Sequence, residues 1–246
     1  MKYLLLVAFL LSTIWAHGQT KDPEKWCKDF LDNYGLSAKE SKNDLDRYDI
    51  GPILLRTPHS NVFGIIGANF RRIQVNLFSV TKSNKNTNEY LVTGVTKVGS
   101  NVNEFTGTIA LRTARYYEPN RFDMPYKSPI SPDTIGVAFF DYLFNESRKD
   151  DHSGFFKGIL AVSFYILDGQ IQYNDLRKGA DEFTNNEYVG TWTGYATSNT
   201  LVCNWGDYRI PNVIGFDCGA GEFAPCDQYE KFGWQDYRAS KDWWAN

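Results

Sequence analysis

The feature that most constrains the fold is a two-residue alternation of side chains, which begins near residue 52 and recurs along the chain. In the stretch 73–78 the inward set is Ile73, Val75 and Leu77, and a second such stretch covers 105–112. Successive side chains of a strand point to opposite faces, so this period marks half-buried β-strands. We therefore expect antiparallel sheet structure, whose strands bury one face and solvate the other.

Short polar clusters separate these stretches and indicate turns. Two of them lie at 82–88 and 99–101. The pair Asp168-Gly169 joins 158–167 to 170–173 and is the strongest hairpin signal in the chain. The predicted fold is all-β: an antiparallel meander that closes into a lipocalin-like barrel or packs as a two-sheet sandwich.

The segment before the strands is predicted to be helical, over 19–50, and the β-rich domain with its aromatic C-terminal tail covers 51–246. A helix over 22–34 has Asp22 as N-cap, Pro23 at its first position and Gly35 after its end. A second short helix is expected from the capping-box spacing of Ser37 and Glu40, with Leu45 and Tyr48 as its apolar anchors. The apolar stripe of the first helix consists of Trp26, Phe30 and Tyr34.

The first 18 residues have the pattern of a secretory signal peptide. Lys2 precedes the apolar run Tyr3–Ala16, which is too short to span a bilayer. Ala16 and Gly18 supply small residues for a cleavage site, although a buried N-terminal helix is the alternative interpretation. No later stretch approaches about 18 continuous apolar residues, so we expect no membrane span. The expected location is the periplasm or the extracellular medium.

Four cysteines remain after removal of 1–18, and an even number in an exported chain favours two disulfides. Cys218 and Cys226 flank a turn-rich segment, so a local bridge is expected there. That would leave Cys27 to pair with Cys203. The spacings do not fit a zinc site, because no two cysteines lie two to four residues apart and no histidine is near. We expect no metal and no cofactor.

An aromatic residue followed two positions later by glycine recurs at three strand starts. Both residues of each pair point to the same face of the sheet, where the missing side chain leaves room for a neighbouring ring. A packing role is the simpler interpretation, and a ligand-binding repeat is the alternative. The three pairs are Phe105 and Gly107, Phe156 and Gly158, and Tyr188 and Gly190.

Composition and motifs exclude several functional classes. With 26 basic against 29 acidic residues, the chain has no global attraction for nucleic acid, and it is too apolar for a disordered protein. His59 and His152 lie in turn or loop sequences without a nearby nucleophile motif, and no phosphate loop or dinucleotide fingerprint occurs. We therefore favour a protein without a catalytic residue. A glycan hydrolase with two carboxylates is the alternative, with candidates Asp141, Glu182, Glu187, Asp207, Asp217 and Glu222.

The segment 203–212 is the most unusual in the chain and supplies the candidate binding residues. Trp205 and Tyr208 are predicted to be stacking platforms for a sugar or peptide, with Asp207 and Arg209 as polar contacts on one strand face. The alternative is a disulfide-anchored loop that closes one barrel end, with its ion pair satisfying buried polar groups.

Two resemblances accompany these patterns. The segments 69–73, 90–98, 105–109 and 203–211 look like those of a group of exported proteins from Bacteroidetes-type bacteria, a resemblance that implies export but no assigned activity. Gly190-Thr191-Trp192 resembles the G-x-W motif of lipocalin-like barrels.

The predicted function is that of an exported, non-enzymatic binding or structural protein. It would engage a glycan, peptide or small amphiphile through an aromatic-lined surface. Besides the hydrolase, the remaining alternative is a subunit of a cell-envelope assembly, in which exposed aromatic side chains contact a protein partner.

Overall fold

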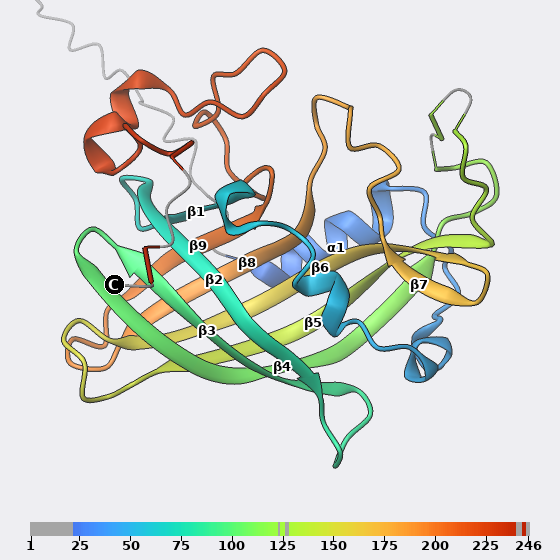
Figure 1. Cartoon of the computed structure of the whole chain (residues 1–246), viewed down its shortest axis with the longest axis horizontal. Coiled ribbons are helices and arrows are strands. Elements are labelled where there is room, and N and C mark those ends of the chain that lie inside the picture. Colours follow the sequence, from blue (N-terminus) through green and yellow to red (C-terminus); the bar gives the residue numbers. More distant parts are fainter. Residues whose placement is uncertain (1–21, 123, 126–127, 240–242, 245–246) are drawn as a thin grey trace, which may run out of the picture.

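A computed structural model of the chain describes residues 22–122, 124–125, 128–239 and 243–244. The predicted signal peptide, 1–18, lies outside the described residues. Within them, eight antiparallel strands form a closed barrel, and a ninth short strand extends one hairpin (Figure 1). The strands are β1 (Val62–Ile66), β2 (Arg71–Lys82), β3 (Glu89–Val98), β4 (Asn101–Tyr116), β5 (Thr134–Glu146), β6 (Gly154–Leu167), β7 (Gln170–Tyr173), β8 (Asn185–Gly194) and β9 (Thr200–Asp207).

The barrel is a meander, as one of the two predicted architectures requires. Each strand pairs with the next along the chain, except that β8 pairs with β6 because β7 only prolongs the β6 hairpin. The β1–β9 pairing closes the sheet. Closure removes exposed sheet edges, which is the general advantage of this architecture. The fold is therefore a lipocalin-like barrel and not a two-sheet sandwich.

Side chains fill the barrel interior. The alternation expected from the sequence is confirmed on β2 and β4, where Ile73, Val75, Phe105 and Ile109 are all buried. An eight-stranded barrel is just wide enough to be filled in this way. The interior ring cluster consists of Tyr142, Phe144, Phe156, Tyr188 and Trp205, with Trp205 stacked on Tyr188 at 4.5 Å between ring centroids.

Glycines on neighbouring strands make room for these rings. A Cβ atom added at Gly190 would lie 2.3 Å from the Tyr142 hydroxyl oxygen and 2.3 Å from the Lys157 carbonyl oxygen. One added at Gly107 would lie 2.8 Å from a ring carbon of Phe144. Real side chains do not approach so closely. The repeated aromatic-x-glycine pattern therefore serves packing.

The predicted turn at Asp168-Gly169 is also confirmed. Both residues have positive φ, 51° and 71°, which is the geometry of a two-residue type I′ hairpin between β6 and β7. Asp and Gly are among the residues that tolerate this conformation best. The turn chemistry alone therefore determines the register at this point.

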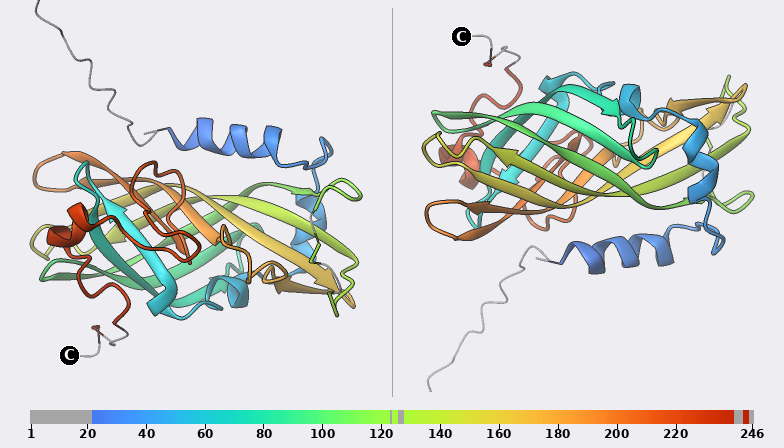
Figure 2. Two further views of the ribbon diagram at one scale, coloured as in Figure 1. Left: turned by 90° about the horizontal axis from the view of Figure 1, so that it is seen from above. Right: turned by 90° about the horizontal axis from the view of Figure 1, so that it is seen from below.

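Helical segments cover the outside and one end of the barrel. Helix α1 runs along the outer wall (Figure 2), and the Asp22 side chain caps it by accepting from the backbone N–H of Glu24 and Lys25. The capping-box prediction at Ser37 is wrong, because the Ser37 N–H pairs instead with the Tyr116 carbonyl. The helices are α1 (Pro23–Asn33), α2 (Gly51–Leu54) and the 3₁₀ segments η1 (Lys42–Arg47), η2 (His59–Asn61) and η3 (Asp227–Phe232).

The aromatic C-terminal segment packs on the outer face of β1 and β9, as the sequence indicated for a tail lying on the body of the protein. Phe63 of β1 stacks on Phe223 at 4.4 Å between ring centroids. Trp234 is only 1% exposed, and its indole N–H donates to the Phe70 carbonyl at 2.8 Å. This segment therefore contributes a second apolar cluster, outside the barrel.

The cysteines pair only in part as predicted. Cys218 and Cys226 form the expected local disulfide, with Cα atoms 5.0 Å apart. The predicted Cys27–Cys203 bridge is wrong: both are buried free thiols. Cys27 lies on the face of α1 that packs against the outer wall, whereas Cys203 belongs to the hydrophobic core inside the barrel, so the barrel wall separates them.

Thiol counting tests this arrangement. Burial raises the pKa of the Cys27 thiol to about 11 and also raises that of Cys203, so both should react slowly in the native protein. We expect an aromatic disulfide reagent to label neither thiol within minutes in buffer. In denaturant without reductant it should label two, and after reduction four. Complete absence of label in denaturant without reductant would contradict the assignment of free thiols.

Substitution of Gly190 tests the packing account. Gly190→Ala should lower the free energy of unfolding by about 2 kcal/mol, because overfilled cores force side chains and backbone to move. Gly179, whose added Cβ would meet nothing within 4 Å, provides the control, and Gly179→Ala should change the stability by less than about 0.5 kcal/mol. Urea unfolding measures both. Equal stability of the two variants would argue against the ring–glycine fit.

Candidate functional site

The structure separates the four residues predicted to form one recognition surface. Strand β9 ends at Asp207, and Tyr208 has a φ of +65°, which reverses the alternation of faces. Trp205 and Asp207 consequently lie inside the barrel, whereas Tyr208 and Arg209 lie outside it. The prediction that Asp207 and Arg209 share a face is wrong, and Arg209 pairs with Asp217 instead.

Inside the barrel, Asp207 is the centre of a buried polar cluster. Its Oδ2 atom accepts hydrogen bonds from the Thr57 hydroxyl at 2.8 Å, the Tyr173 hydroxyl at 3.0 Å and the Asn186 amide at 2.8 Å. Burial raises the pKa of this carboxyl to about 7, against the opposing effect of the three donors. Asn186 also donates to the Ile53 carbonyl at 3.3 Å. The cluster thus ties α2 and the residues after it to the barrel wall.

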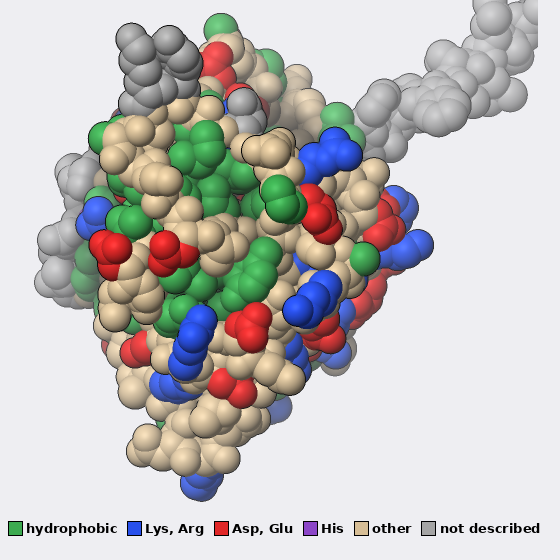
Figure 3. All heavy atoms as spheres, turned by 90° about the vertical axis from the view of Figure 1, so that its right-hand side faces the viewer, with side chains coloured by type: hydrophobic (Ala, Val, Ile, Leu, Met, Phe, Trp, Pro, Cys, Tyr) green, Lys and Arg blue, Asp and Glu red, His purple; other side chains and the backbone are tan. Residues whose placement is uncertain are grey.

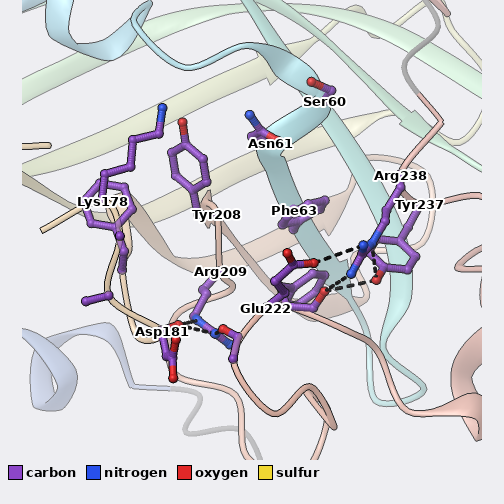
Figure 4. A pocket seen from close by; sticks show the side chains of 15 residues that line it. Ser60, Asn61, Phe63, Lys178, Asp181, Tyr208, Arg209, Glu222, Tyr237 and Arg238 are labelled. Atoms are coloured by element: carbon purple, nitrogen blue, oxygen red, sulfur yellow. Dashed lines mark hydrogen bonds and ion pairs between the residues drawn. The ribbon is translucent and has the colours of Figure 1, made fainter.

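Outside the barrel, Tyr208 and Arg209 line a depression of about 690 Å³, here called the outer groove (Figure 4). Tyr208 and Lys178 lie on one side of it, and Glu222 and Arg238 lie on the other. Its remaining walls come from η2, β1, the loop before β8 and the C-terminal segment. They include Ser60, Asn61, Phe63, Asp181, Phe183, Phe223 and Tyr237.

Arg209 holds the outer groove together. Its guanidinium donates to the backbone carbonyls of Asp181 and Gly221 and pairs with the Asp217 carboxylate. Asp217 in turn accepts from the backbone N–H of Ala224 at 3.0 Å. These contacts join the loop before β8 to the disulfide-closed loop of the tail. Arg209 therefore shapes the groove, with its guanidinium already bonded within the protein.

Tyr208 presents its ring in the outer groove. Its backbone N–H donates to the Asn61 carbonyl at 2.7 Å, which fixes the left-handed conformation. The Lys178 ammonium lies 5.3 Å from the ring centroid, and the Phe183 ring is 5.2 Å away. The Tyr208 hydroxyl has no hydrogen-bond partner among the described residues. A bulky residue at positive φ is a genuine outlier, and such strain is concentrated at functional sites.

The opposite rim of the outer groove is polar. Arg238 pairs with Glu222 at 3.1 Å, and its Nε donates to the Tyr237 hydroxyl at 2.8 Å. Tyr237 itself donates to the Phe223 carbonyl at 3.0 Å. The groove thus combines an available aromatic ring with hydrogen-bonding groups of both kinds. This combination suits recognition of a polyhydroxylated ligand.

Both ends of the barrel are hollowed. At the β7 end, hydrophobic side chains gather among charged ones (Figure 3), and a hollow of about 730 Å³ there is lined by Tyr48, Ile53 and Ile171. At the other end Glu146 is 5% exposed and accepts from Thr96, Gly154 and the indole of Trp192. Trp192 belongs to the segment that resembles the lipocalin motif. Its indole N–H donates to the Glu146 carboxylate at this end of the barrel.

The six acids predicted as hydrolase candidates are dispersed. Asp207 is inside the barrel, Asp217 bonds Arg209, and Asp141 pairs with Arg112 on the outer wall. Glu222 lies on the outer groove, whereas Glu182 and Glu187 line a different groove beside α1. The structure thus brings only these last two together in one depression.

Comparison of the chain with protein-family models, with curated proteins and with solved structures returned no match. In the described ranges no three or more His, Cys, Asp or Glu side chains are placed to hold a metal ion. The same part of the chain has no helix both long and apolar enough to cross a membrane. Sequence reasoning missed Thr57, Tyr173 and Asn186, because their convergence on Asp207 depends on barrel closure.

The buried Asp207 cluster should make stability depend on pH. The folded-state pKa of about 7 lies above the ordinary value, so the native state holds an extra proton between about pH 4 and 7. Its contribution is therefore largest at low pH and is lost as the pH rises towards 7, by at most about 1.4 kcal/mol per pH unit. Asp207→Asn should flatten this slope in urea unfolding at pH 4.5 to 7.5. An unchanged slope would contradict the assignment.

Proposed function

We propose that the protein is an exported, non-enzymatic binding protein that holds a glycan in the outer groove, with Tyr208 as the stacking platform. The observation that carries the proposal is the backbone of Tyr208. A tyrosine at φ +65° costs about 1–3 kcal/mol relative to relaxed backbone. Glycine would adopt the same conformation without that cost. This cost in free energy is explained if the Tyr208 ring contacts a ligand in the groove.

The polar surroundings of the ring favour a sugar over an apolar ligand. Lys178 lies beside Tyr208, Ser60 and Asn61 lie between the two sides, and Glu222 lies across the groove (Figure 4). Such groups donate to and accept from hydroxyls, while an aromatic face packs against the C–H face of a pyranose ring. A small amphiphile would need an apolar cavity, and the barrel interior is packed with side chains.

Export is part of the proposal. The Cys218–Cys226 disulfide supports an oxidising compartment, where such bonds form and persist. The apolar run and small residues before Gln19 support a secretory signal. The periplasm and the extracellular medium remain the two proposed locations.

A single substitution tests the role of the Tyr208 ring separately from its backbone conformation. Tyr208→Gly removes the platform and keeps the left-handed conformation, so the variant should unfold at the same temperature or higher. Against a panel of maltoheptaose, cellohexaose, chitohexaose and mannohexaose, the wild type should bind at least one member. The variant should bind that member at least about tenfold more weakly, since stacking contributes about 1.5 kcal/mol. Isothermal titration calorimetry measures the affinities.

Ser198→Gly is the matched control, because Ser198 also has positive φ, 54°, but lies in the turn between β8 and β9. Its affinity should equal that of the wild type. Absence of binding to the whole panel, or full affinity in Tyr208→Gly, would refute the proposal. Chromatography of the incubated panel tests the hydrolase alternative, which requires shortened oligosaccharides. Recovery of a stoichiometric envelope protein with the tagged chain would instead favour an assembly subunit.

A further inference from the structure

A second depression, here called the side groove, lies between α1 and the barrel wall. It has a volume of about 490 Å³. Rings of Trp26 and Phe30 from α1 line it together with Tyr117 and Phe183. Glu187 of β8 lies among these rings. It adjoins the outer groove, with which it shares Ala180 and Phe183, but its aromatic faces from α1 surround a different carboxylate.

The rings of the side groove are held in place by the core beneath them. Phe30 packs edge-on against the fully buried Phe139 at 5.4 Å between centroids, and Trp26 does so at 6.1 Å. Trp26 and Phe30 also contact each other at 6.0 Å. Aromatic side chains fixed in this way form a preorganised surface, which lowers the entropic cost of binding a small ligand.

Glu187 differs from the other acids that the fold buries. Asp207 and Glu146 each accept three hydrogen bonds from neighbouring groups. The Glu187 carboxylate accepts none from any described residue, although it is partly buried. Burial and then the negative charge of Asp207 raise its pKa to about 7. A partly desolvated carboxylate without a donor is costly for the protein alone.

The charges around Glu187 leave its negative charge uncompensated. On the loop between β7 and β8, Arg177 pairs with Glu182. Tyr117 faces Glu187 from the segment after β4. Trp26 and Phe30 of α1 and Tyr34 directly after the helix, which also line the groove, are uncharged. With the arginine and Glu182 cancelling, ionised Glu187 gives the groove a net negative charge.

We propose that the side groove binds a small organic ammonium cation, held between the aromatic faces of α1 and the Glu187 carboxylate. Rings attract cations through the negative potential of their faces, most strongly where water is excluded. The carboxylate supplies the counter-charge, for which the described residues offer no hydrogen-bond donor. Neither interaction requires the outer groove, so this inference stands independently of the glycan proposal.

Choline and its uncharged isostere 3,3-dimethyl-1-butanol are the probes that test this site. Choline should bind at the side groove and shift the NMR signal of the Trp26 indole N–H, whereas the isostere should bind at least tenfold more weakly. Choline keeps its charge at every pH, so its affinity should rise between pH 6 and 8 as Glu187 loses its proton. Among the described residues, the other titratable groups that line the groove or act on Glu187 are Tyr34, Tyr117, Arg177, Glu182 and Asp207.

Glu187→Gln should weaken choline binding at least tenfold at pH 8 and remove the rise with pH. Glu104→Gln is the control of equal charge change, since Glu104 is exposed on β4 and lines neither groove, and its affinity should stay within twofold of wild type. Circular dichroism melting confirms that both variants fold. Trp26→Leu supplies a second test, because it removes one ring of the side groove without changing its charge. Equal binding of choline and the isostere, no choline binding, or full affinity in Glu187→Gln would overturn the proposal.

Discussion

The fit between interior rings and neighbouring glycines is the constraint on which the rest of the structure depends. Tyr142 lies where any side chain at Gly190 would have to be, and Phe144 stands in the same relation to Gly107. Eight strands enclose a space that side chains can fill, and here aromatic residues fill it. A barrel packed in this way gains stability from burial, and it leaves little room for a ligand inside.

Helix α1 and the C-terminal segment form the two grooves that we propose as binding sites in place of the barrel interior. Helix α1 and the C-terminal segment each pack on the outer wall through an apolar cluster of their own. A groove remains beside each of them, because a helix or loop laid on a curved sheet covers only part of it. Arg209 joins the two loops that border the outer groove, whereas fixed rings and Glu187 define the side groove. Both proposed binding sites therefore lie on the outside of the barrel.

Local signals predicted much of this architecture. The Asp22 cap, the Asp168-Gly169 turn and the alternation on β2 and β4 depend on neighbouring residues, and each is confirmed. The expected second helix forms as η1 with Leu45 buried, but it begins at Lys42 and not at Ser37, because a backbone pairing of Ser37 with Tyr116, distant in sequence, outweighs a capping preference. Cysteine parity likewise could not reveal that the barrel wall separates Cys27 from Cys203.

The candidate site was only half predictable for a similar reason. The segment around Trp205 and Tyr208 was recognised by its composition, yet a strand period cannot foresee that Tyr208 adopts positive φ and turns Arg209 away from the face of Asp207. The sequence did not distinguish Glu187 from the other five candidate acids. Its distinguishing feature is the lack of a hydrogen-bond donor among the described residues, which becomes visible only once the chain is folded.

The central claim is that the barrel interior is packed and that ligands bind on its outer wall. Nuclear magnetic resonance mapping of an oligosaccharide complex tests it most directly. We expect shifted signals at Asn61, Lys178 and Tyr208, with the indole N–H of Trp205 unmoved, since that ring is 2% exposed inside the barrel. Large shifts at Trp205 and Tyr188 with an undisturbed outer groove would contradict the claim.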